Sequence, residues 1–107
     1  MLLKYNFEID NSVLADKYTK FINEIYKLLP SREEGLDWEK PLATVLEELA
    51  GLSRLLQYEA YDRIFLTFMG KLEGLFVLTE DIHFALFRKT IFECLSLLGV
   101  LKNACQI

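Results

Sequence analysis

Apolar side chains recur at helical spacing along most of this chain, and this periodicity constrains the possible folds more than any other feature. Between residues 12 and 29 one stripe is apolar and the opposite side carries lysine, asparagine and glutamate. The stripe consists of Leu14, Tyr18, Phe21, Ile22, Ile25, Leu28 and Leu29. A similar stripe crosses residues 38–57. Because amphipathic helices must bury such stripes against one another, the pattern predicts an all-α fold.

Four helices are expected, over residues 12–29, 38–57, 61–77 and 80–103. We predict that the first helix ends before Pro30, that residues 30–37 form a loop, and that Asp37 caps the second helix. No proline or glycine marks the boundary between the second and third helices, so one bent helix is the alternative there. A chain of 107 residues, 52% of them hydrophobic, can bury one core. The prediction is one domain, residues 1–107, built as a four-helix bundle.

Residues 1–10 follow a different period. Apolar and polar side chains alternate there, as in a half-buried strand, and the apolar set is Leu3, Tyr5, Phe7 and Ile9. A strand needs a hydrogen-bonding partner, and the chain offers no second strand. We therefore expect a short N-terminal β-strand that pairs across a dimer or with another protein's sheet edge, or an extended arm that lies on the bundle.

Two helical stretches, residues 64–70 and 94–101, have no charged residue on any face. A helix that is apolar all round must be covered on all sides, and a small domain has little interior to supply that cover. Phenylalanine is also more abundant in this half than one stripe requires, at positions 65, 68, 76, 84, 87 and 92. Such an excess of rings either builds an unusually heavy core or supplies interface anchors. Together with the uncharged stretches, it predicts a homodimer. The predicted interface residues are Tyr5, Phe7, Phe65, Phe68, Leu95 and Leu98.

The net charge of −4 lies in one region of the chain. Residues 31–48 carry six acidic and two basic residues, and the remaining residues sum to zero. An acidic chain without a lysine or arginine cluster lacks the charge that binding to nucleic acid or to an anionic membrane needs. We expect another protein as the partner, facing an acidic surface formed by Glu33, Glu34, Asp37 and Glu39.

No sequence motif predicts catalysis, a cofactor or a metal site. His83 is the sole histidine, and no Cys-x-x-Cys pair accompanies it. No apolar run approaches the length of a transmembrane helix, and no export signal is visible. Cys94 and Cys105 lie about 16 Å apart along one helix, too far for a disulfide, which favours a reducing, cytoplasmic setting. The predicted function is non-enzymatic protein–protein interaction, as an adaptor, an inhibitor or a chaperone-like protein.

Two alternatives come from resemblances. The order of strand, helix, loop and helix resembles that of ribbon-helix-helix repressors, dimers whose paired strands enter the major groove of DNA. This resemblance implies DNA contacts from Lys4, Asn6 and Glu8.

Residues 47–52 and 71–75 resemble the acidic motifs of MazG-type nucleoside-triphosphate pyrophosphohydrolases. That resemblance implies a magnesium-dependent hydrolase whose ligands are acidic side chains on facing helices, here Glu47, Glu48, Glu59 and Asp62. Gly51 and Gly74 stand where the family pattern has acidic residues.

Overall fold

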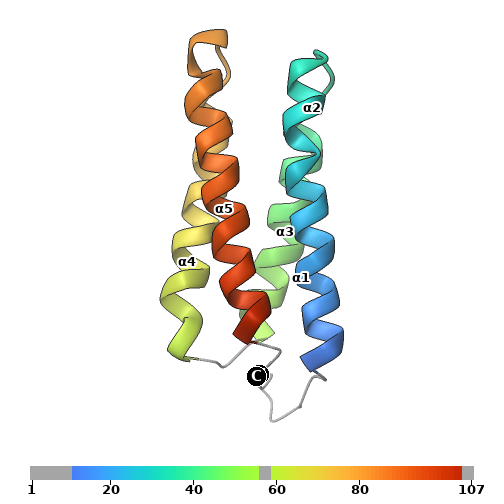
Figure 1. Cartoon of the computed structure of the whole chain (residues 1–107), viewed down its shortest axis with the longest axis vertical. Helices are drawn as coiled ribbons and strands as arrows, with labels where there is room; N and C mark the ends of the chain where they lie inside the picture. The colour runs from blue at the N-terminus through green and yellow to red at the C-terminus, as the bar shows by residue number, and fades with distance from the viewer. Residues whose placement is uncertain (1–10, 56–58, 105–107) are drawn as a thin grey trace.

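The computed structural model describes residues 11–55 and 59–104, and every regular element in those ranges is helical. The predicted N-terminal strand lies outside the described residues. The described residues form four long helices, which run alternately in opposite directions (Figure 1). They are α1 (Asn11–Tyr26), α3 (Glu39–Leu55), α4 (Glu59–Gly74) and α5 (Phe84–Ala104). The predicted all-α, four-helix architecture is confirmed for this part of the chain.

The four helices form a closed ring of neighbours, in which α1 packs on α3 and α5, and α4 packs on the same two helices. The bundle measures 45 × 22 × 21 Å. Because α3 and α4 are antiparallel neighbours, the alternative of one bent helix is ruled out (Figure 1). Asn11 and Ala104 lie at one end of the bundle, and the turns from α1 to α3 and from α4 to α5 lie at the other.

The first helical segment is longer than predicted. Lys27 interrupts the helix for one residue, and a short helix, α2 (Leu28–Glu33), then continues in the direction of α1 (Figure 1). Pro30 lies in the first turn of α2, where its missing N–H is not needed for a helical hydrogen bond. α1 does end before Pro30, but the prediction that a loop begins at Pro30 is wrong, because residues 30–33 belong to α2.

Gly35, rather than Pro30, ends this segment. It adopts a left-handed backbone conformation with φ of +72°. Its N–H donates to the carbonyl of Arg32 at 3.1 Å, and the N–H of Leu36 donates to the carbonyl of Ser31 at 2.8 Å. This pair of hydrogen bonds is the Schellman arrangement, which closes a helix by satisfying its last carbonyl groups.

The other predicted boundaries agree with the structure to within a few residues. Oδ1 of Asp37 accepts hydrogen bonds from the backbone N–H groups of Glu39 at 3.0 Å and Lys40 at 3.2 Å, so the predicted cap of α3 is confirmed. Two 3₁₀ turns, η1 (Leu75–Val77) and η2 (Asp81–His83), join α4 to α5.

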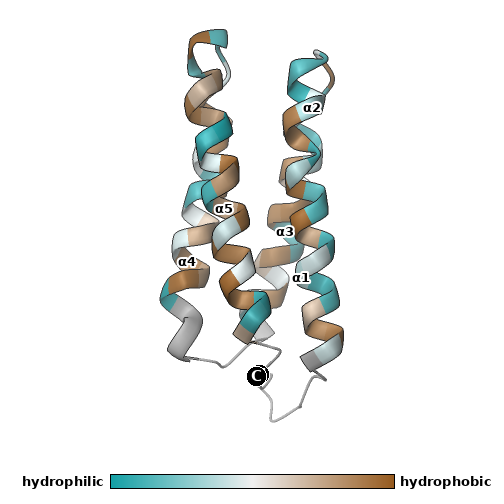
Figure 2. Ribbon diagram, viewed as in Figure 1, coloured by the Kyte–Doolittle hydropathy of each residue, from teal (hydrophilic) through white to brown (hydrophobic). Residues whose placement is uncertain are grey.

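The core runs along the inside of the bundle, and Figure 2 shows hydrophobic residues alternating with hydrophilic ones along each helix. Its largest fully buried members include Tyr18, Phe68, Phe87, Leu42, Leu49, Leu72 and Ile91. Part of each uncharged stretch is covered by the chain's own helices, because Phe65, Phe68, Cys94, Leu98 and Leu101 belong to this core, whereas Leu66 and Val100 are exposed. In the ranges described, no helix has the length and hydropathy required to span a membrane.

One ion pair joins α4 to α5. Nζ of Lys71 lies 2.6 Å from Oε2 of Glu93, on a partly exposed flank of the two helices. The hydrogen bond lowers the pKa of the Glu93 carboxyl and raises the pKa of the Lys71 ammonium. The pair adds a polar contact between the two helices outside their apolar contact.

Candidate functional site

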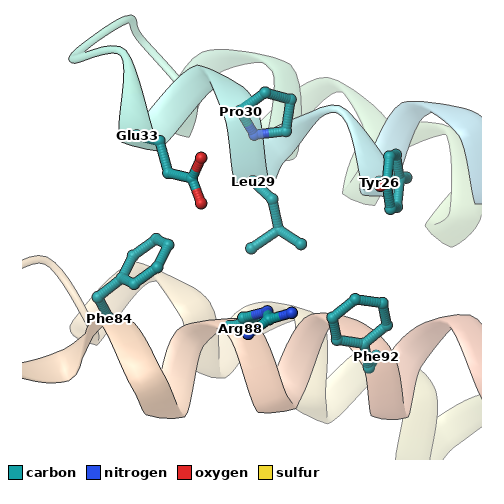
Figure 3. Close-up of a pocket in the computed structure, with 7 residues that line it drawn as sticks. All are labelled: Tyr26, Leu29, Pro30, Glu33, Phe84, Arg88 and Phe92. Carbon is teal, nitrogen blue, oxygen red and sulfur yellow. The ribbon is translucent and has the colours of Figure 1, made fainter.

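A groove opens between α1/α2 and α5, in the half of the bundle that contains the connections from α1 to α3 and from α4 to α5. Its volume is about 410 Å³. Figure 3 shows the two facing walls, and we call the site the α2–α5 groove. The α1/α2 wall carries Tyr26, Leu29, Pro30 and Glu33, and the α5 wall carries Phe84, Arg88 and Phe92.

Helical spacing explains why these residues share a wall. Phe84, Arg88 and Phe92 are four residues apart, so they form a row along α5. This row lies beside the buried row that includes Phe87 and Ile91, which faces the core. The second row of α5 is mixed: Phe84 packs partly against the core, whereas Arg88 and Phe92 are exposed.

The groove combines an apolar lining with two opposite charges. Phe92 is 43% exposed and Tyr26 is 55% exposed, so both aromatic side chains are accessible from solvent. The guanidinium of Arg88 lies 5.6 Å from the centre of the Phe92 ring. Glu33 is exposed on the opposite wall (Figure 3). Within the described residues, neither Glu33 nor Arg88 forms an ion pair.

Arg32 on α2 contacts residues of the opposite wall and of the turn that precedes α5. Its guanidinium carbon lies 4.3 Å from the centre of the Phe87 ring, and the rings of Trp38 and Phe84 lie 5.5 Å and 5.6 Å away. Nη2 of Arg32 donates a hydrogen bond to the carbonyl of Glu80 at 2.8 Å. An arginine placed over aromatic rings is attracted by their π-electrons, so Arg32 stabilises the junction of α2, α3 and α5.

Most of the predicted interface residues are inside the protomer. Phe65, Phe68 and Leu98 are buried, and Leu95 is partly buried against the core. They have apolar neighbours within their own chain, so the need for cover by a second chain, from which the interface was predicted, does not arise for them. Tyr5 and Phe7 lie outside the described residues.

The predicted acidic surface adjoins the groove. Glu33, Glu34, Asp37 and Glu39 are all exposed around the end of α2 and the start of α3. Asp37 also serves as the helix cap, and Glu33 lines the groove itself. The predicted acidic surface and the groove therefore share Glu33.

The residues of the two alternative functions are only partly described. Glu47 and Glu48 are exposed on α3, and Glu48 lies 3.5 Å from Nζ of Lys20 on α1. The side chains of Glu59 and Asp62 are outside the description, as are Lys4, Asn6 and Glu8. Among the side chains that the structure does describe, no group of three or more histidine, cysteine, aspartate or glutamate residues is placed to hold a metal ion.

The groove was not predicted from the sequence, although one signal for it was present. Phe92 belongs to the excess of phenylalanine noted above and lies outside the buried row of α5, whereas Phe84 packs partly against the core. Subtracting the core stripe of α5 from its aromatic residues would have selected Phe92. The same subtraction over residues 12–29 would have selected Tyr26, which lies outside the apolar stripe.

The described residues define a compact all-α protein with four long helices and an open groove at one end. Comparison with protein-family models, with curated proteins and with solved structures finds no match to this chain.

Proposed function

We propose that this chain is a non-enzymatic interaction module that binds a protein segment in the α2–α5 groove. The observation that carries the proposal is the exposure of Tyr26 and Phe92 within an apolar groove whose walls are already formed. Aromatic anchors beside charged groups are typical of protein interfaces. The module would act as an adaptor, an inhibitor or a chaperone-like protein, by occupying its partner's surface.

The contacts around Arg32 support a groove that exists before binding. Its ring contacts and its hydrogen bond to Glu80 connect α2 to the turn that precedes α5. A preformed site loses less conformational entropy on binding than one that must be ordered. The polar side chains around the groove, among them Glu33 and Glu34, favour a partner segment with basic residues next to its apolar ones.

A photo-cross-linking experiment in the native cell tests this function. A photo-reactive phenylalanine analogue is introduced at position 92, in the groove, or at position 66, where Leu66 is 70% exposed on α4 and lies outside the groove. We expect irradiation to link position 92 to a discrete protein, and position 66 to link to no protein consistently. The mass of the product shows whether the captured protein is another copy of this chain or a different protein.

Two results would contradict the proposal. One is the absence of any cross-linked protein from position 92. The other is an identical set of products from positions 92 and 66, because that would indicate general surface stickiness rather than a specific groove.

A further inference from the structure

We infer that the occupant of the α2–α5 groove is a second copy of this chain, related to the first by a two-fold axis that sets Glu33 of each copy against Arg88 of the other. This inference rests on the proposed function and names the partner of the same groove. It is carried by the charges of the groove, which are opposite in sign, on opposite walls and without an ion-pair partner in the described part of the chain.

A two-fold axis pairs residues reciprocally, so that if residue i meets residue j of the partner, residue j also meets residue i. One acidic and one basic residue are therefore sufficient for two intermolecular ion pairs. The surface around Glu33 and Arg88 is self-complementary in this sense, since each copy supplies both signs of charge. A different protein would need one basic and one acidic residue, spaced as Arg88 and Glu33 are, to form both ion pairs.

The apolar residues of the groove fit the same arrangement. Glu33 and Arg88 both lie among apolar side chains, with Phe84 facing Glu33 and Leu29 facing Arg88 (Figure 3). The axis passes between the two charged residues, so the two ion pairs lie on either side of it and the apolar linings of the two grooves face each other between them. An apolar centre with charged groups toward its edge is the usual anatomy of a stable interface.

The charged residues next to Glu33 and Arg88 have the same signs as these two residues. Glu34 follows Glu33 at the end of α2, and Lys89 follows Arg88 on α5; both are exposed. The two-fold arrangement brings the acidic end of α2 from one copy alongside the basic segment of α5 from the other. The attraction is strongest where the copies overlap, and this offsets the repulsion between two chains of net charge −4.

Charge reversal tests the pairing. The mass in solution of the wild-type chain, of Glu33→Arg, of Arg88→Glu and of the double variant is measured by analytical ultracentrifugation over a range of concentrations. We expect the wild-type chain to dimerise, each single reversal to raise the dimer dissociation constant at least about tenfold, and the double reversal to recover most of the loss. Control reversals outside the groove, Arg54→Glu and Glu73→Arg, are expected to leave the dissociation constant unchanged.

Mixing the two single variants gives the sharpest result. In a dimer of Glu33→Arg with Arg88→Glu, both intermolecular pairs again join opposite charges, so the mixture should dimerise although neither variant does so alone. This result also shows that both variants are folded. An absence of dimer in the wild type, or no association in the mixture, would overturn the inference.

The two proposals fail separately. If position 92 cross-links to a different protein and the chain stays monomeric, the groove binds a protein but the inferred occupant is wrong. If the wild-type chain dimerises but neither reversal weakens the dimer, the copies meet through another surface.

Discussion

At the scale of single residues, Cys94 shows how the core controls chemistry. Its side chain is fully buried on α5, and burial raises the pKa of the thiol to about 12. The thiolate is the reactive form of cysteine, so a buried thiol with a raised pKa is unreactive while the protein stays folded. Unfolding exposes the group and returns its pKa to the ordinary value near 9.0.

Cys94 is expected to make the stability of the fold depend on alkaline pH. Between pH 9 and 12 the unfolded chain loses the thiol proton and the folded chain keeps it, so the free energy of unfolding decreases as the pH rises. Cys94→Ala removes this contribution. We predict that the stability advantage of the wild type over Cys94→Ala, measured by urea denaturation, shrinks above pH 9 by up to about 1.4 kcal/mol per pH unit.

A constant difference between the two proteins from pH 7 to pH 11 would contradict this prediction. The comparison with Cys94→Ala is needed because tyrosine and lysine side chains also titrate in this range. Their contributions are common to both proteins and cancel in the difference.

At the scale of elements, two glycines in similar surroundings are expected to respond oppositely to alanine. Gly35 has a positive φ at the end of α2, and Gly51 lies within α3 with no heavy atom within 4 Å of an added Cβ. We predict that Gly35→Ala lowers the free energy of unfolding by about 1–2 kcal/mol, because L-residues are strained in the left-handed conformation. Gly51→Ala should raise it by about 0.5–1 kcal/mol, because alanine favours the helix.

Thermal or urea denaturation of the two variants measures both signs. If Gly35→Ala were as stable as the wild type, the Schellman arrangement would not be what closes α2. If Gly51→Ala were destabilised, the open space around that position in α3 would be in doubt.

The helices themselves could be predicted because their periodicity is local. The core stripe of α1 that includes Leu14, Tyr18 and Ile25 is set by spacing alone, and the structure buries all three. The end of α2 could not be placed in the same way, because the prediction took Pro30 as a terminator. A proline is also compatible with the first turn of a helix, and the one-residue interruption at Lys27 creates such a first turn.

At the scale of the whole molecule, the interior position of Phe68 can be tested directly. Phe68→Ala should lower the free energy of unfolding by about 3–5 kcal/mol, a large part of the total for a domain of this size. Leu66→Ala, on the exposed side of the same helix, should change it by less than about 0.5 kcal/mol. Urea denaturation measures both values.

Phe68→Leu extends the test if the alanine variant does not fold, and it should show a smaller loss of the same kind. The original prediction placed Phe68 in an interface between chains. Little loss of stability accompanied by a loss of self-association would restore that prediction and remove Phe68 from the core.

The way the helices pack explains which features could be predicted from the sequence and which could not. An apolar helix face needs cover, and the sequence shows that need for residues 64–70 and 94–101 without showing what meets it. The other helices of the same chain cover Phe65, Phe68 and Leu98. The α2–α5 groove could not be predicted from the sequence for a related reason. Its two walls are separated by about fifty residues in the chain and meet only through packing.

Both ends of the described chain lie at the same end of the bundle. Asn11 and Ala104 lie at the end of the bundle opposite the connections from α1 to α3 and from α4 to α5, which is the end away from the groove (Figure 1). If two copies pair with Glu33 of each against Arg88 of the other, residues on opposite walls of the groove, the two-fold axis runs more nearly along the groove than across it, and the chain ends of both copies lie on the same side of the assembly. The dimer would then gather whatever is attached to the two copies on that one side.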